Sequence, residues 1–227
     1  MVLLRNGKRL KFKILKNSFE KNIFINCPFD NDYHKLLRPL LFTIIYCGYN
    51  PRIALERFDS AELRLDKIKQ LIDQSSLSIH DLSKIRATKK NEYYRLNMPF
   101  EIGLDLGCKL YNPDKKYRNK RSLILENERY GYQKALSDIS SSDVKCHGGD
   151  PEDLVIEVRN WFSELGCLNL VSGSTIWDDY NFFFTDFHED RTIKGFKEKD
   201  LDKMPVPEFI SFIENWILKN NKKNHCA

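Results

Sequence analysis

The feature that most constrains the fold is the alternation of short apolar runs with longer amphipathic segments. Apolar runs that end at polar or turn-forming residues occur at 22–27, 51–56, 76–83 and 121–127, with a weaker one at 143–149. Segments with helical spacing follow them, at 30–48, 60–75, 97–111, 129–139 and 150–166. This order predicts an α/β fold, a doubly wound parallel five-stranded sheet in the flavodoxin-like order 2-1-3-4-5.

Several helix boundaries have recognisable signals. Asp30, Ser60 and Asp150 stand where an N-cap is expected, because their side-chain oxygens can accept from the free amides of a first turn. Gly48 and Gly166 follow the last apolar positions of two segments, as a helix-ending glycine does.

The chain is expected to have three parts. Residues 1–20 form an N-terminal extension, 21–167 the α/β domain, and 168–227 a helical C-terminal extension. The extension contains an aromatic and acidic stretch, "WDDYNFFFTDFHED" at 177–190, and an amphipathic helix at 206–220. It either packs back on the domain or mediates contacts in a homo-oligomer.

Charge and cysteine content exclude several classes of protein. The net charge of +5 (37 basic against 32 acidic residues) comes from scattered residues, which favours phosphate-bearing ligands but argues against nucleic-acid binding. No apolar run is long enough to span a bilayer, and charges interrupt the first 20 residues, so we expect no membrane association and a cytoplasmic location. The six cysteines lack zinc-ligand spacing, which argues against a metal site and a disulfide framework.

Polar residues follow the first and third predicted strands. Asn26 and Asp30 follow the first, Asp81 ends the third, and the loop beyond it leads to Asn97 and Glu101. These two strands are neighbours in the predicted order, and open parallel sheets bind ligands where the strand order reverses. We therefore expect the three groups to meet in one crevice.

Asp81 and Glu101 form the candidate catalytic pair. One carboxylate could attack or stabilise an electron-poor sugar carbon while the other handles protons, as in glycoside chemistry. Glu101 could instead be a favourable charge at a helix N-terminus, and Asp81 the start of an Asx turn. Six further residues are candidates for substrate binding: Asn26 and Asn97 for ribose hydroxyls, Phe29 and Tyr33 for stacking on a base, Asp30 in the crevice, and Arg64 for a phosphate.

Four nearby residues are given structural roles. His80 precedes Asp81 and should point to the opposite face of the sheet, as a buried histidine with satisfied hydrogen bonds. Gly103 and Gly107 share one helix face, which predicts close packing of this helix on the sheet. Cys27 is read as a small buried residue rather than a nucleophile.

The motifs "FINCPFD", "SSLSIHDLS" and "NMPFEIGLDLGCKL" resemble the TIR-like branch of the superfamily that includes the nucleoside 2-deoxyribosyltransferases. The resemblance covers about residues 21–165. The deoxyribosyltransferase pattern pairs a strand-end aspartate with a glutamate in an "FELG"-type helix start, and Asp81 and Glu101 match these places. The resemblance implies that Glu101 is the nucleophile, and it implies a role in antiphage defence. Here "NMP" replaces the "GT" or "SG" usual before the motif.

These observations favour a hydrolase of the N-glycosidic bond of NAD, a nucleotide or a nucleoside, or a related deoxyribosyl transferase. NAD or the nucleotide would be the substrate or ligand, and no cofactor is implied. Two alternatives stay open, which are a nucleotide-sensing domain without catalysis and a TIR-like protein-interaction module. The aromatic stretch at 180–187 motivates the second of these.

Overall fold

The computed structural model describes residues 18–85, 96–134, 136–139 and 143–220. Its core is one parallel sheet in the order β2-β1-β3-β4-β5, which confirms the predicted order. The strands are β1 (Asn22–Asn26), β2 (Asn50–Ile53), β3 (Leu77–Asp81), β4 (Arg121–Glu126) and β5 (Val144–Cys146). In the register of β1 and β3, Asn26 is opposite His80, so these two strands end side by side.

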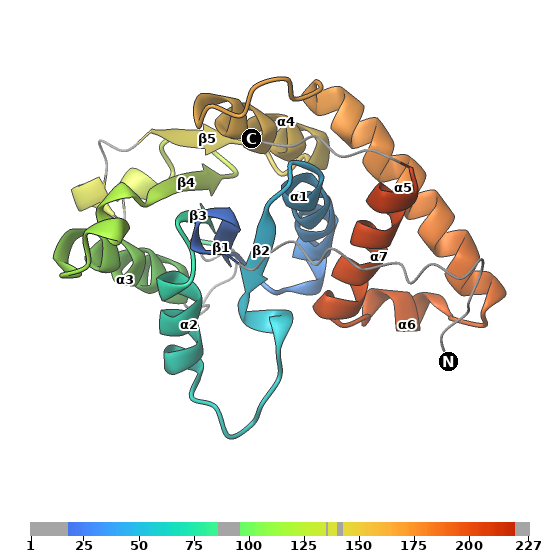
Figure 1. The fold of residues 1–227 in the computed structure, drawn as a ribbon, viewed down its shortest axis with the longest axis horizontal. Coiled ribbons are helices and arrows are strands. Elements are labelled where there is room, and N and C mark those ends of the chain that lie inside the picture. Colours follow the sequence, from blue (N-terminus) through green and yellow to red (C-terminus); the bar gives the residue numbers. More distant parts are fainter. Residues whose placement is uncertain (1–17, 86–95, 135, 140–142, 221–227) are drawn as a thin grey trace.

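Helices cover both faces of the sheet, and further helices lie outside one face (Figure 1). The helices are α1 (His34–Tyr46), α2 (Arg64–Asp73), α3 (Asn97–Tyr111), α4 (Pro151–Glu164), α5 (Gly173–Ile193), α6 (Glu198–Asp202) and α7 (Val206–Lys219). Helices α1 and α4 pack on one face and α2 and α3 on the other, while α5, α6 and α7 lie beyond α1.

The alternation of side chains along the strands separates these two layers. Ile23 and Ile25 belong to the large core that includes α1 and α4, whereas Phe24 belongs to the cluster under α2. All three side chains are buried, because both faces of the sheet are covered. Because of this alternation, consecutive side chains at the end of a strand point to opposite faces of the sheet.

The C-terminal extension packs back on the domain through α1. The ring of Phe42 stacks on that of Phe183, with centroids 5.4 Å apart, and it also contacts Trp216 of α7. Arg38 donates from Nη2 to the backbone oxygen of Leu201 at 2.6 Å, which ties α1 to α6. The extension was expected either to pack back on the domain or to mediate contacts in a homo-oligomer, and in the structure it packs on the domain.

Three boundary signals are confirmed. Asp150 accepts from the amides of Glu152 and Asp153 and caps α4. Gly48 and Gly166 follow α1 and α4 with φ of 84° and 93°, a region that glycine enters without steric cost.

Two expected N-caps are wrong. Helix α2 begins at Arg64 rather than after Ser60, because Asp59 accepts from the amide of Ala61 in a local turn and Arg57 holds Glu62 by an ion pair. Asp30 does not cap α1, because a 3-10 turn (Asn31–Tyr33) intervenes and α1 starts at His34.

Two expected elements also differ. The predicted helix at 129–139 is instead a pair of short 3-10 turns, Tyr132–Lys134 and Ser137–Ile139. The buried carboxylate of Glu126 accepts from the amide of Tyr132, which anchors the first turn to the end of β4. The predicted strand at 51–56 ends early, because a 3-10 turn (Ala54–Glu56) follows β2.

Within the described ranges, no helix has the length and apolar character needed to cross a bilayer. Cys27, Cys47, Cys108 and Cys146 are free thiols. Cys167 is disulfide-bonded, which the spacing of the cysteines did not predict.

Candidate functional site

Glu101 lies one turn into α3 and faces the sheet. Only 6% of its side chain is exposed, and its Oε1 accepts from Nη2 of Arg64 at 3.3 Å. Burial raises the pKa of Glu101 above its ordinary value, and the positive charge of Arg64 opposes this only in part. Glu101 lies beyond the first turn of α3 and is buried, so it is not an exposed charge at the helix N-terminus.

The explanation expected for the two glycines of α3 is wrong. A Cβ added at Gly103 or Gly107 would meet nothing within 4 Å, so neither glycine allows a close approach to the sheet. The buried residues of α3 are instead Met98, Glu101, Ile102 and Asp105. Helix α3 therefore presents two carboxylates, one turn apart, to the sheet.

Arg64 joins two of the predicted site residues. As the first residue of α2 it reaches Glu101 on α3, and its guanidinium carbon lies 5.8 Å from the centre of the Phe29 ring. Its side chain is 52% exposed, so the cation borders solvent while the carboxylate below it does not. The structure thus brings together Phe29, Arg64 and Glu101 from three separate segments.

Asn26 connects the end of β1 to the start of α3. Its Nδ2 donates to the backbone oxygen of Met98 at 2.9 Å and lies 3.1 Å from Nδ1 of His80. The carbonyl of Met98 can only accept, which fixes the orientation of the Asn26 amide. Its Oδ1 is buried and has no hydrogen-bond partner among the described residues.

His80 points to the α3 face, as predicted, and is hydrogen-bonded on both ring nitrogens. Asn26 donates to Nδ1, so the proton of a neutral ring is on Nε2, which lies 3.1 Å from Oδ2 of Asp105. Asp105 also contacts Nζ of Lys120 at 3.1 Å and accepts from Ser78. Burial alone would raise the pKa of Asp105, but these neighbours, His80 first, hold it well below its ordinary value.

Asp81 lies in a separate cluster on the α1 side of the sheet. Its Oδ2 accepts from the hydroxyl of Tyr33 at 2.5 Å and lies 3.2 Å from Nε2 of His147, while Oδ1 accepts from the amide of Ser83. The amide of Gly149 donates to Nδ1 of His147, so Nε2 carries the proton toward Asp81. Burial opposes ionisation, but these partners lower the pKa of Asp81, and it is a carboxylate at neutral pH.

Asp81 and Glu101 are thus held by different partners, Asp81 by Tyr33 and His147 and Glu101 by Arg64. Cys27 follows β1 and is influenced by both, because burial and the charges of Asp81 and Glu101 all raise the pKa of its thiol. Such a thiol stays protonated, which agrees with the reading of Cys27 as a buried residue of the core.

The other predicted binding residues have different surroundings. Tyr33 is almost fully buried, so its ring offers no face to a base. Asp30 is half-buried, and its backbone oxygen accepts from the amide of Tyr33. Asn97 is exposed at the first position of α3. No group of three potential metal ligands occurs in the described part of the chain.

Sequence reasoning missed Asp105, Lys120 and His147. Asp105 could have been found from its position four residues after Glu101, which places both on one helix face. His147 follows β5 and precedes Gly148 and Gly149, both at positive φ, a tight turn at a strand end. Lys120 gave no signal, because it lies among several other basic residues at 115–121.

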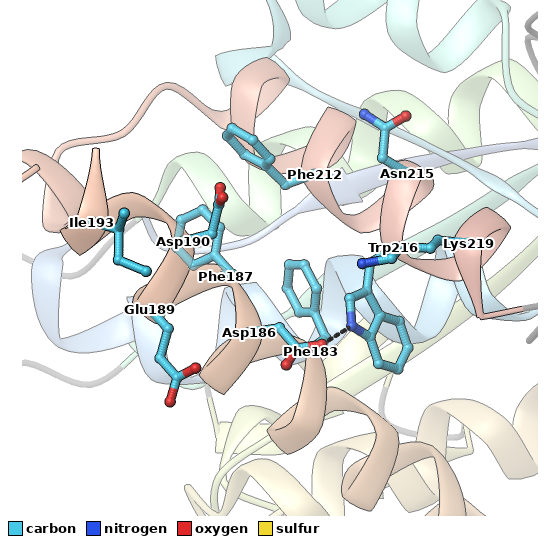
Figure 2. A pocket seen from close by; sticks show the side chains of 10 residues that line it. All are labelled: Phe183, Asp186, Phe187, Glu189, Asp190, Ile193, Phe212, Asn215, Trp216 and Lys219. Carbon is cyan, nitrogen blue, oxygen red and sulfur yellow. Dashed lines mark hydrogen bonds between the residues drawn. The ribbon is translucent and has the colours of Figure 1, made fainter. Parts of the chain in front are cut away.

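A groove of about 480 Å³ lies elsewhere, between α5 and α7 (Figure 2). Its lining combines aromatic and acidic side chains, with Nε1 of Trp216 donating to Asp186 at 2.7 Å. Phe183 and Phe187, from the aromatic stretch that favoured an interaction module, are buried at its base and stack on each other. That stretch is therefore explained largely by packing within the chain.

Comparisons with protein-family models, with curated proteins and with solved structures give no match.

Proposed function

We propose that this protein hydrolyses the N-glycosidic bond of a nucleotide, with Glu101 as the nucleophile and NAD as the favoured class of substrate. The proposal rests on the surroundings of Glu101. Its carboxylate is buried, its pKa is raised by burial, and its one side-chain partner among the described residues, Arg64, is 3.3 Å away. It lies near the edge where the parallel strands end, which is where such sheets bind ligands. A carboxylate that served only the fold would have more partners, as Asp81 and Asp105 do.

The chemistry requires few groups. Oε of Glu101 attacks C1′ of the ribose, the C1′–N bond breaks, and its electron pair goes to the departing nitrogen. Water then attacks C1′, the ester C–O bond breaks to restore the carboxylate, and the proton of the water goes to solvent. In this proposal the buried Oδ1 of Asn26, which has no hydrogen-bond partner among the described residues, accepts from a ribose hydroxyl.

The nature of the leaving group favours NAD over ordinary nucleosides. A neutral purine or pyrimidine needs a proton as it departs, and Asp81, which the sequence offered as the acid, is ionised and occupied by its partners. A pyridinium ring leaves as a neutral molecule without a proton. In this proposal Asp81 is a positioning residue that fixes the end of β3 beside α1.

The resemblance to TIR-like and deoxyribosyltransferase-like proteins supports the same chemistry and a cytoplasmic defence role. Two alternatives remain as outcomes of the test. A nucleotide sensor would use the same residues for binding alone, and an interaction module or homo-oligomer would use the groove between α5 and α7 of the 168–227 segment.

The test is to incubate the purified full chain with NAD, nucleotides and nucleosides and to measure released base by chromatography. Glu101→Gln should abolish release, whereas Glu189→Gln, an exposed glutamate on α5, should leave it unchanged. Calorimetry on the same panel separates the alternatives: tight binding without turnover indicates a sensor, and equal turnover by Glu101→Gln would refute the proposal.

A further inference from the structure

Arg64 is held differently from three other cations around α2. Arg52 makes two hydrogen bonds of 2.9 Å to Glu56, and Arg57 is paired with Glu62 at 2.5 Å. Lys67 is buried and donates to a backbone oxygen at 3.0 Å. These three cations are thus engaged in contacts within the protein.

Arg64, in contrast, uses one nitrogen. Its only hydrogen bond in the described part of the chain is the 3.3 Å contact to Glu101, longer than the usual distance for a charge-assisted pair. The guanidinium has five N–H donors in a planar fork, so most of them stay available toward solvent. Phe29 lies beside the guanidinium and can hold it by a cation–π contact when the link to Glu101 breaks.

Resting on the proposed function, we infer that Arg64 is a phosphate-sensing gate over Glu101. A phosphate group on the substrate draws the guanidinium away from Oε1, and the carboxylate is then free to attack. The substrate class is therefore a nucleotide or dinucleotide. A nucleoside has no phosphate to displace Arg64, so Glu101 stays paired with Arg64 and reacts poorly.

The chemistry of the two anions explains why the exchange can occur. A phosphate offers two or three oxygens to the fork of an arginine, whereas Glu101 offers one at long range. Arg64 is half-exposed, so an incoming phosphate reaches it without burial. Removal of the positive charge also makes the buried carboxylate of Glu101 more basic, which strengthens it as a nucleophile.

The first test uses nicotinamide riboside and its 5′-phosphate, which share one glycosidic bond and differ only in the phosphate. For the wild-type chain, kcat/KM should be higher for the phosphate by about tenfold or more. In Arg64→Gln, kcat/KM for the 5′-phosphate should fall, mainly because KM rises. At alkaline pH, kcat/KM of this variant for the riboside should equal or exceed that of the wild type. Lys69→Gln, which removes another exposed cation from α2, should match the wild type.

A second test separates a gate from a simple phosphate-binding residue. Inorganic phosphite, added with the riboside, should stimulate base release by the wild type and have no effect on Arg64→Gln. If phosphite only inhibits, or if Arg64→Gln keeps the wild-type preference for the phosphate, the gate is refuted while the hydrolase proposal stands.

A binding measurement needs no turnover. Pyrophosphate should bind Glu101→Gln more tightly than the wild type, because the competing carboxylate is gone, and weaker binding to that variant would refute the gate. If the wild type releases base from neither compound nor from NAD, the proposed function itself fails, a result distinct from the loss of phosphate preference.

Discussion

Glu101 and Asp105 lie one turn apart on the sheet-facing side of α3, and their pKa values are shifted in opposite directions. Burial raises the pKa of Glu101, whereas His80, Lys120 and Ser78 overcome burial and lower that of Asp105. Divergent pKa values on neighbouring acids are typical of sites in which one carboxylate reacts and the other organises its surroundings. On this helix, Glu101 is the reactive candidate.

The first prediction concerns the stability of Glu101→Gln. A buried carboxylate with one long contact costs the fold desolvation energy, and the neutral amide removes that cost. At neutral pH the variant should be as stable as the wild type or more stable, by up to about 1 kcal/mol, while base release falls about a thousandfold or more. Urea unfolding and product chromatography measure the two effects, and a strongly destabilised variant would indicate a structural role for Glu101.

The second prediction is a pH profile. If Glu101 must be ionised to react, kcat/KM should rise with pH through a pKa above the ordinary value for glutamate. Arg64 lowers this pKa, so Arg64→Gln should move the rising limb to higher pH, with Lys69→Gln as the unshifted control. A limb that stays in place in Arg64→Gln would show that the titrating group is not Glu101.

The third prediction concerns Asp105. Lys120 is buried beside it, so Asp105→Asn leaves a buried cation short of its partner and should cost about 3 kcal/mol or more. The double variant Asp105→Asn/Lys120→Met removes both charges and should recover much of that loss. Urea unfolding of Asp105→Asn, Lys120→Met and this double variant, with exposed Asp66→Asn as control, measures the coupling, and additive losses would contradict it.

The sequence predicted the sheet order because the period of apolar residues and the positions of turn residues are local properties. The sequence placed Phe29 and Glu101 in one crevice because parallel strands end at one edge, whereas it suggested Arg64 only as a phosphate ligand and not as the partner of Glu101. It did not predict that Asp81 and Glu101 belong to different clusters. Asp81 points to the α1 side because side chains alternate along β3, and its partner His147 lies 66 residues away in the sequence and reaches it only in the folded chain.

The fourth prediction distinguishes positioning from reaction at Asp81. Asp81→Asn disturbs bonds to Tyr33 and His147 and should destabilise the fold by about 2–3 kcal/mol, yet turnover per folded molecule should stay within about tenfold of wild type. The pKa of Asp81 is lower in the folded protein than in the unfolded chain. Ionised Asp81 therefore stabilises the fold above its pKa in the unfolded chain, and this stabilisation is lost as pH falls through its pKa in the folded protein.

Between about pH 4 and lower values the wild type should therefore lose the stability that ionised Asp81 contributes, whereas the stability of Asp81→Asn should depend less on pH. Circular dichroism across that pH range measures how steeply stability changes with pH. If Asp81→Asn were fully folded but inactive, Asp81 would instead take part in the reaction.

The fifth prediction compares two adjacent phenylalanines of α5. Phe183 is 1% exposed and packs on Phe42 and Trp216, so Phe183→Ala should cost about 3–5 kcal/mol. Phe182 is 66% exposed, and Phe182→Ala should change stability by no more than about 0.5 kcal/mol. Thermal unfolding of both variants measures whether α5 is part of the cooperative core. If Phe183→Ala were neutral and Phe182→Ala changed the oligomeric state by light scattering, the extension would be an assembly surface instead.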